Sequence, residues 1–513
     1  MLREDIVNNK VISAEEAVKL IKDGASLVIQ GSGGGVAEPT LLMKTLGERY
    51  KKEGHPRGLT VVHSTGLGDK KEIGMDYLAQ EGLVKRDIAG HLGMAPAMGK
   101  LILENKVEAY NFPQGVLSHM YSAVAAKTPG VITKVGLHTY IDPRLEGGKM
   151  NEITKEDLVK VIQLEGEEWL FWPRFHFDVA FVRGTTADTK GNITMEEEGA
   201  FLEATTIAQA AKNCGGIVIA QVKYLAQAGT LNPHLVKIPG IYVDYIVIDP
   251  EQKQTAIDFY NPAFCGHVKV PLERIPPIPL DERKVIARRA AKELFSGAVV
   301  NLGVGLPSGI ASVATEEGFI DQFTLTVEQG PIGGTPVGGV TFGVAYNPEA
   351  IIPMDSQFRF YDGGGLDVAF LGMAETDREG NVNSSKVGGM LAGCGGFINI
   401  TQNAKKVVFC GTFTAKDFQC QVGGGKLTIL SEGKVKKFVQ AVHQITFSGK
   451  YARTKHQKVL YITERAVFSL EEDGVHLLEI APGIDLERDV LSQMEFKPVV
   501  DPHLKTMDKE IFS

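Results

Sequence analysis

The chain has 513 residues, of which 43% are hydrophobic and 23% charged, a length that exceeds what one hydrophobic core usually supports. The net charge of −8 argues against a surface that binds nucleic acid, although it still allows a local basic pocket for a phosphorylated ligand. The five cysteines are far apart and form no CxxC pair, so they predict neither a disulfide framework nor a zinc site.

The N-terminal segment, residues 1–5, contains no apolar signal core, and no stretch approaches the roughly 18 apolar residues of a membrane span. We therefore expect a cytoplasmic protein without a membrane segment. The 58 glycines exceed the usual share of about 7% and gather in clusters. Such clusters predict loops in which the backbone bends sharply or approaches a ligand.

The first predicted unit is a helix, a buried strand and a glycine-rich loop. The helix begins at Ser13 with the Ser-x-x-Glu pattern of a capping box, and Gly24 is placed to end it. The apolar strand 26–30 follows, and the loop 31–35 (Gly-Ser-Gly-Gly-Gly) comes directly after it. This order is typical of an α/β fold.

The same order of elements returns downstream, as a helix over 283–295, a strand over 298–302 and a loop over 303–307. A longer match joins 178–194 to 367–383 without a gap. These repeats predict two homologous α/β domains, each a mostly parallel β-sheet flanked by helices. The proline-rich stretch 271–279 separates them, which places the domains at 1–270 and 280–513.

Two further segments distinguish the halves. The first half carries extra material over roughly 105–175. The second half is expected to close with strands and then with a last amphipathic helix after Gly483, the strands being 459–463, 466–470 and 476–480.

A single carboxylate, Glu328, ends the β-prone run 323–327 and precedes the glycine-rich run 330–336. The carboxyl end of a strand is where an α/β sheet presents its chemistry. The corresponding segment of the first half, 59–66, has no acid, so the fold by itself does not require one. This asymmetry favours a functional role for Glu328 over a solvated surface glutamate.

The glycine clusters fit neither a dinucleotide fingerprint nor a phosphate-binding P-loop, because the GxGxxG and GxxxxGK[ST] spacings are missing. They could instead present backbone N–H groups to a negative charge, or they could only allow close packing of the loops. The candidate donors are Gly303, Gly305, Gly395 and Gly396. A carboxylate facing such donors suggests acyl chemistry with Glu328 as the nucleophile, which needs no metal or redox cofactor.

Several motifs together resemble the family I coenzyme A transferases, and the likeness spans nearly the whole chain. They are GAVVNLGVGLP (297–307), VEQG (327–330), GGLDV (364–368), GCGG (393–396), YITERAVF (461–468) and, in the first half, FPQG (112–115). The first half resembles the α-type half of the family and the second resembles the β-type half. Within the family, the chain is most similar to single-chain transferases of the propionate and acetate type.

This resemblance implies a CoA-transferase fold in which Glu328 forms a glutamyl-CoA thioester. It also implies Gln114 as a partner across the domain interface, coenzyme A and acyl-CoA as substrates, no tightly bound cofactor, and a homo-oligomer (dimer or tetramer). Two departures stand out. Val327 and Gln329 replace the Ser and Asn that many 3-oxoacid transferases have beside the glutamate, and Asn399 stands where many relatives have Asp.

The expected function is ping-pong transfer of coenzyme A between a short-chain acyl-CoA and a free short monocarboxylate, in the range of acetate, propionate, butyrate and lactate. Two alternatives stay open. One is an acyl-CoA hydrolase on the same scaffold, in which water takes the glutamyl intermediate. The other is a non-catalytic ligand-binding or regulatory protein.

Overall fold

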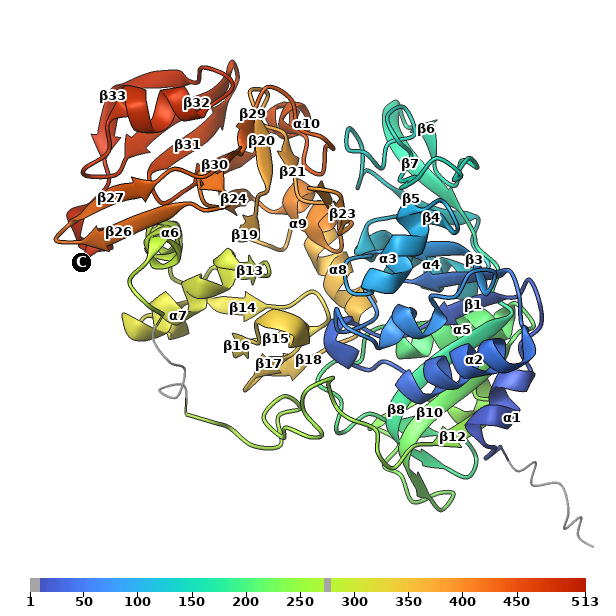
Figure 1. The fold of residues 1–513 in the computed structure, drawn as a ribbon. Coiled ribbons are helices and arrows are strands. Elements are labelled where there is room, and N and C mark those ends of the chain that lie inside the picture. Colours follow the sequence, from blue (N-terminus) through green and yellow to red (C-terminus); the bar gives the residue numbers. More distant parts are fainter. Residues whose placement is uncertain (1–9, 272–277) are drawn as a thin grey trace, which may run out of the picture.

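The computed structural model describes residues 10–271 and 278–513, and it forms an α/β fold with two sheets side by side (Figure 1). The predicted fold class is therefore confirmed. The middle of the predicted proline-rich boundary, 272–277, lies outside the described residues. No helix in the described ranges has the length and apolar character that crossing a membrane requires.

The first sheet has nine strands, and its central strands run parallel in the order β12-β10-β8-β1-β2-β3-β4. Its strands are β1 Ser26–Ile29, β2 Leu59–His63, β3 Val84–Ala89, β4 Glu108–Asn111, β8 Val179–Asp188, β9 Ile193–Thr194, β10 Ile217–Ala226, β11 Val236–Ile238 and β12 Tyr245–Ile248. These apolar strands are largely buried, as a sheet covered on both faces requires.

The second sheet has ten strands, and its centre repeats the parallel order of the first as β30-β24-β19-β13-β14. Antiparallel strands extend it at β15 and β18 and at β31 and β32. Its strands are β13 Val299–Leu302, β14 Thr324–Thr326, β15 Pro331–Ile332, β18 Ala350–Ile351, β19 Val368–Gly372, β24 Lys406–Cys410, β30 Lys458–Ile462, β31 Ala466–Glu471, β32 Gly474–Ile480 and β33 Val499–Thr506.

The repeat is visible in individual hydrogen bonds. The Asp188 carboxylate accepts from the backbone N–H of Asn192 at 3.0 Å, and the Asp377 carboxylate accepts from that of Asn381 at 3.0 Å. Each turn passes through a glycine with positive φ, which is a conformation that other residues adopt only with strain. The two copies therefore kept the same turn, and the repeated Asp-x-x-Gly-Asn pattern records it.

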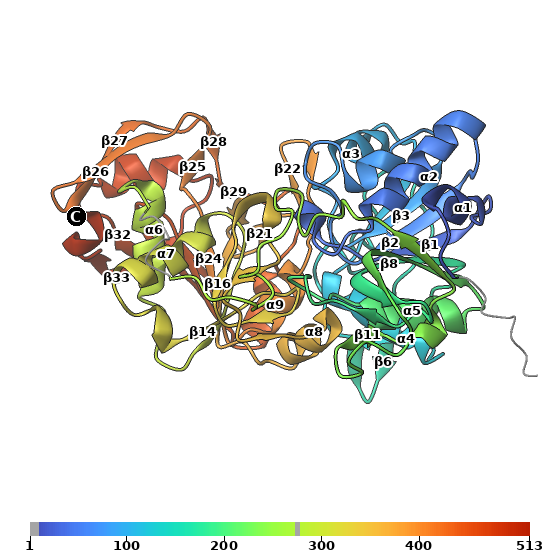
Figure 2. The same cartoon turned by 90° about the horizontal axis from the view of Figure 1, so that it is seen from below.

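Helices flank both sheets: α1 Ala14–Lys19, α2 Thr40–Glu53, α3 Pro96–Leu103, α4 Gln114–Ala125, α5 Ala204–Asn213, α6 Glu282–Ala291, α7 Gly309–Glu316, α8 Met354–Asp362, α9 Phe397–Asn403 and α10 Gly449–Thr454. The predicted capping box at Ser13 is present. Helix α4 of the first half packs against α5 and also against α8 of the second half, and α8 packs against α9. Figure 2 shows α8 and α9 between the two sheets, beside α4 and α5. This helical layer joins the halves.

Two segments differ from simple α/β repeats. The extra material of the first half contains a small antiparallel sheet of β5 Gly130–Thr133, β6 Lys160–Leu164 and β7 Glu167–Pro173. The predicted C-terminal amphipathic helix is wrong, because the segment after Gly483 forms only short helical turns and then β33, which pairs with β32.

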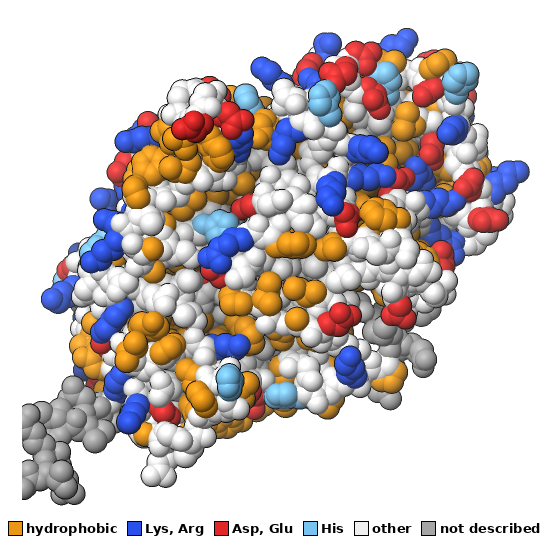
Figure 3. Space-filling model, turned by 180° about the vertical axis from the view of Figure 1, so that it is seen from behind, with side chains coloured by type: hydrophobic (Ala, Val, Ile, Leu, Met, Phe, Trp, Pro, Cys, Tyr) orange, Lys and Arg blue, Asp and Glu red, His pale blue; other side chains and the backbone are white. Residues whose placement is uncertain are grey.

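On the face in Figure 3, basic and acidic side chains are intermixed rather than separated by sign.

Candidate active site

A cavity of about 420 Å³ lies between the two halves and is lined by residues of both. Most of the site residues predicted from the sequence line it, namely Gln114 from the first half and Gly303, Glu328, Gly395 and Gly396 from the second. The wall thus combines the carboxyl ends of strands from two sheets. Gly305 is not among the described residues that line it.

Glu328 follows strand β14 and is partly exposed to the cavity. Burial raises the pKa of its carboxyl group to about 7, and hydrogen bonds from its own backbone and from Asn301 oppose part of the rise. None of the described ion pairs involves this carboxylate. The ionised Glu328 carboxylate is therefore poorly stabilised, and it faces the cavity.

A buried network of uncharged groups lies beneath Glu328. The Tyr361 hydroxyl donates to Thr326 Oγ1 at 2.7 Å and accepts from Gln357 Nε2 at 2.9 Å. Asn301 Nδ2 donates to the carbonyl oxygen of Thr326 at 3.3 Å. Amides and hydroxyls hold the strand end in place without offering the carboxylate a cation, which keeps its pKa high.

The glycine cluster 393–396 is fastened to the first half. The N–H of Cys394 donates to Asn111 Oδ1 at 2.8 Å, and the N–H of Gly395 donates to the carbonyl oxygen of Gly90 at 2.7 Å. The first of these acceptors ends β4 and the second follows β3. The expectation that the Gly395 N–H is a free donor for an oxyanion is therefore not met, because that group already has an acceptor.

The neighbouring glycine differs. Gly396 precedes helix α9, and a methyl group on its α-carbon would lie 3.5 Å from Glu328 Cγ. Within the described residues, its N–H has no hydrogen-bond acceptor. Gly396 is thus close to the carboxylate and carries a free backbone donor.

Gly303 and Gly305, in the loop that follows β13, do not supply donors in the expected way. The N–H of Gly303 donates to the carbonyl oxygen of Phe370 at 2.8 Å and so continues the sheet. Gly305 turns the chain with a φ of 90° ahead of a short 3-10 helix that contains Pro307. Their contribution is to bring the backbone close to the cavity and then direct it away.

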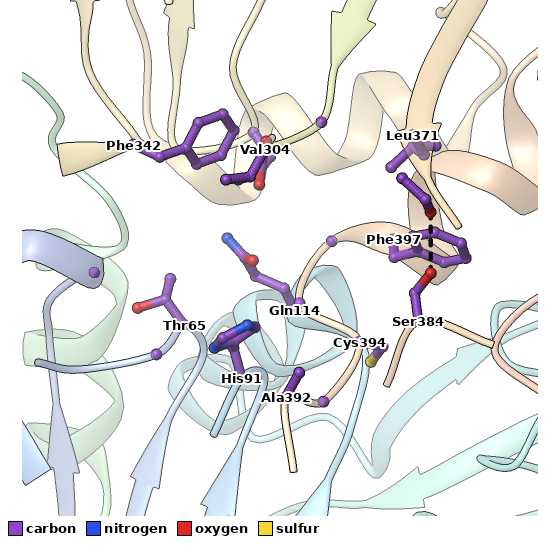
Figure 4. A pocket seen from close by; sticks show the side chains of 18 of the residues that line it. Thr65, His91, Gln114, Val304, Phe342, Leu371, Ser384, Ala392, Cys394 and Phe397 are labelled. Atoms are coloured by element: carbon purple, nitrogen blue, oxygen red, sulfur yellow. Dashed lines mark hydrogen bonds between the residues drawn. The ribbon is translucent and has the colours of Figure 1, made fainter. Parts of the chain in front are cut away.

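Gln114 is the first residue of α4 and is 3% exposed. Its backbone N–H donates to the carbonyl oxygen of Gly395 at 2.9 Å, and its Nε2 lies 3.0 Å from Met354 Sδ. In Figure 4 its side chain reaches into the cavity between His91 and Val304. An amide from the first half therefore lines the same cavity as the Glu328 carboxylate.

Comparison with known proteins identifies the family. The model of the coenzyme A transferase family matches residues 11–249. The chain is 48% identical to acetate CoA-transferase YdiF of Escherichia coli (strain K12), over 98% of this chain and 95% of that protein. The chain belongs to the coenzyme A transferase family. The resemblance to family I transferases seen in the sequence is confirmed.

Two further relatives extend this finding. The transferase is 50% identical to caffeate CoA-transferase of Acetobacterium woodii, over 98% of this chain and 97% of that protein. Its structure matches acyl-CoA transferase YdiF from Escherichia coli O157:H7, solved as a thioester complex with CoA, at a TM-score of 0.94. That match has 46% sequence identity and covers 100% of this chain and 98% of the other. The protein is a CoA-transferase, which moves coenzyme A between an acyl-CoA and a carboxylate.

Sequence reasoning missed the contribution of the first half to the transferase cavity beyond Gln114. Thr65, Lys70 and His91 also line it, from the loops that follow β2 and β3. Burial lowers the pKa of His91 to about 4, so this imidazole is neutral near pH 7. The sequence singles out only the segment 59–66, which contains Thr65, as the counterpart of the strand end at Glu328.

The first glycine loop has a structural role in this transferase. Gly34 has a φ of 72°, and any side chain there would overlap the carbonyl oxygen of Val340 from the second half. Gln329, next to Glu328, reaches the same loop, since its Nε2 lies 3.3 Å from Ser32 Oγ. The loop therefore closes one side of the cavity by packing against the other half.

Proposed function

We propose that this transferase exchanges coenzyme A between short-chain acyl-CoA and free short monocarboxylates through a thioester on Glu328. One observation carries the proposal. Glu328 is the only carboxylate among the described residues that line the cavity. Its pKa of about 7 and its lack of a paired cation leave it reactive as a nucleophile.

The reaction proceeds in two symmetrical halves. The Glu328 carboxylate attacks the thioester carbonyl, the carbon–sulfur bond breaks, and an acyl-glutamyl anhydride and a CoA thiolate form. The thiolate then attacks the glutamyl carbonyl, which releases the first carboxylate and leaves CoA on Glu328. A second carboxylate reverses both steps, so the thioester energy is kept.

Each attack places negative charge on a carbonyl oxygen, which hydrogen-bond donors must stabilise. The free N–H of Gly396 and the side-chain amide of Gln114 are the donors that we assign to this role. They come from different halves, so the oxyanion site forms only when the halves are assembled. The distant CoA moiety supplies binding energy for these steps.

The lining supports short monocarboxylates as substrates. Apolar side chains make up much of the cavity wall, namely Met94, Val304, Phe342, Leu371, Phe397 and Ile400. Lys70 is the only lysine or arginine among the described lining residues, so a second carboxylate on the acyl chain would find little compensation. We therefore propose acetate, propionate, butyrate and lactate as the substrate range.

The proposal also covers the domain boundaries, the oligomeric state and the location of the protein. We propose domain boundaries at 1–270 and 280–513, because the strands of the two sheets fall on either side. We also propose a cytoplasmic homo-oligomer, a dimer or a tetramer, with coenzyme A bound only as a substrate.

The central test is to incubate the protein with propionyl-CoA, digest it, and search by mass spectrometry for CoA on the peptide that contains Glu328. We expect this adduct in the wild type, and we expect Glu328→Ala to lose the adduct and at least about 10³-fold of the transfer rate. Glu349→Gln, at an exposed position two strands away, is the matched control and should keep both. Full activity in Glu328→Ala would contradict the mechanism.

The same mixture separates transfer from hydrolysis. With acetate present, a transferase forms acetyl-CoA while the total thioester stays constant. A hydrolase would instead release free coenzyme A whether or not acetate is added.

A further inference from the structure

Asn399 links the two halves through both ends of its side chain. It lies in the first turn of α9 and is fully buried. Its Oδ1 accepts from the backbone N–H of Gly115 at 3.1 Å, and its Nδ2 donates to Asp362 Oδ1 at 2.9 Å. One amide therefore joins α4 of the first half to the end of α8 in the second.

An amide suits this place because it accepts and donates at the same time. Burial raises the pKa of the Asp362 carboxyl to about 7, and the hydrogen bond from Asn399 opposes part of that rise. A carboxylate at position 399 could still accept from Gly115. It would, however, leave Asp362 without this donor and place a second acid against it.

The contact with Gly115 fixes the start of α4. The first N–H groups of a helix have no partner within the helix, and two of them are satisfied here by the second half. The Gln114 N–H donates to the carbonyl oxygen of Gly395 and the Gly115 N–H donates to Asn399. A side chain at position 115 would overlap Asn399 Nδ2, so glycine is required for this approach.

We propose that Asn399, supported by Asp362, is a positioning residue that holds Gln114 and Gly396 in place around Glu328. This inference rests on the proposed role of Glu328. Asn399 stands three residues after Gly396 on the same helical turn and contacts the residue after Gln114. It therefore sets the distance between the two groups that we assign to the oxyanion.

The groups that face Asp362 determine how the link responds to pH. His119 of α4 has its Nδ1 3.7 Å from Asp362 Oδ2, and burial lowers the pKa of this histidine. On α9, Asn403 Nδ2 lies 3.5 Å from Asp362 Oδ1. On α8, Arg359 and Asp355 pair with each other at 2.7 Å. Asp362 is thus faced by neutral groups, and a new acid at 399 would interact with it directly.

The test uses variants that change one end of the link at a time. Asn399→Asp keeps the acceptor for Gly115 and removes the donor to Asp362, whereas Asn399→Ala removes both. The double variant Asn399→Asp/Asp362→Asn restores a donor and an acceptor with the two side chains exchanged. Asn403→Asp is the matched control, because it adds an acid near Asp362 on the same helix and leaves the Asn399 side chain bonded to Gly115 of α4.

The measured quantities are the melting temperature, the KM for propionyl-CoA, and the rate of CoA exchange at saturating substrate relative to the wild type at each pH. We expect Asn399→Ala and Asn399→Asp to lower this rate at least about 10-fold with little change in KM, since small displacements of catalytic groups are costly. The defect of Asn399→Asp should grow from pH 6 to pH 8.5, as both acids ionise. The double variant should return to within about threefold at every pH, and Asn403→Asp should stay near the wild type.

Three results would overturn the proposal. The first is wild-type exchange rates in folded Asn399→Ala or Asn399→Asp. The second is a double variant that regains its melting temperature but not its rate, and the third is an equal defect in Asn403→Asp. If Asn399→Ala fails to fold, Asn399→Asp and the double variant still decide the question. Absence of the CoA adduct in the wild type would instead reject the role of Glu328. This result is distinct from the three above, because it concerns the wild type and the others concern the variants.

Discussion

The backbone N–H of Gln114 donates to the carbonyl oxygen of Gly395 at 2.9 Å, across the interface between the two halves. Gln114 begins a helix of the first half, and Gly395 belongs to the glycine loop beside Glu328. The nucleophile and its proposed hydrogen-bond donors therefore depend on one shared interface. The following predictions test how this interface and the carboxylate work together.

The rate of the first half-reaction should depend on pH through Glu328. The nucleophile is the carboxylate form, and burial holds its pKa at about 7. We expect kcat/KM for acyl-CoA to rise about tenfold for each pH unit below 7 and to level off above it. A profile that is flat from pH 5.5 to pH 8 would show that Glu328 has an ordinary pKa.

The stability of the protein should fall as the pH rises, in contrast to the reaction rate. The folded-state pKa of about 7 lies above the ordinary value of 4.5, so the folded protein binds this proton more tightly than the unfolded chain. The contribution of this carboxyl to stability is complete below pH 4.5 and is lost as the pH rises to about 7. The side chain introduced by Glu328→Gln cannot ionise. At pH 8 this variant should therefore have a higher melting temperature than the wild type, and its unfolding free energy should be larger by at most about 3 kcal/mol.

The control for this effect is the same comparison at pH 4.5. There the wild-type carboxyl is protonated in the folded protein, and Glu328→Gln should have nearly the wild-type melting temperature. An equal increase at both pH values would mean that the amide stabilises the site for a reason other than charge burial.

Gly396 and Gly395 should respond differently to an added methyl group. In Gly396→Ala the methyl lies 3.5 Å from Glu328 Cγ and 3.3 Å from Phe358 Cζ, while the backbone φ of −80° suits alanine. We expect a loss of about 10-fold in kcat/KM with a nearly unchanged melting temperature. The cause is the new methyl group, which stands in van der Waals contact with the nucleophile and restricts its movement.

Gly395→Ala is the matched comparison. Its φ of 51° is strained for alanine, but its methyl would meet nothing closer than Gln114 Oε1 at 3.7 Å. We expect a loss of about 1 to 2 kcal/mol in stability and a smaller effect on rate than in Gly396→Ala. The reverse order of rates would contradict the placement of Gly396 beside the carboxylate.

The contact between Gly34 and Val340 should be essential for joining the halves. Gly34→Ala adds a methyl group that overlaps the Val340 carbonyl oxygen, and it also strains a backbone with φ 72°. We expect a loss of about 3 kcal/mol or more, together with lower activity. Thermal unfolding and the exchange assay measure the two effects.

Gly24→Ala separates strain from overlap. Gly24 has nearly the same φ, 73°, but a methyl group there would have no heavy atom within 4 Å. This variant should lose only about 1 to 2 kcal/mol and keep its activity. If both variants behave alike, the overlap with the second half is not important.

The sequence by itself determined the features that depend on local pattern. The capping box at Ser13 forms as predicted, and the repeated segments 178–194 and 367–383 contain the same Asp-x-x-Gly-Asn turn, because the hydrogen bonds of each motif join residues within four positions of each other. The strand that precedes Glu328 follows from its apolar, β-prone composition. Comparison of the two halves was enough to show that the fold does not require an acid there.

The tertiary structure decided what those local features do. Gly395 was expected to offer a free N–H, but the carbonyl oxygen of Gly90, about 300 positions away in sequence, accepts from it. The predicted C-terminal helix became β33, an exposed edge strand whose structure comes from pairing with β32 rather than from its own pattern. In the sequence, Asn399 is only a departure from a motif. Its two hydrogen-bond partners, Gly115 and Asp362, belong to distant segments, so only the tertiary structure identifies them. Contacts of this kind depend on how the two sheets assemble, which no local pattern records.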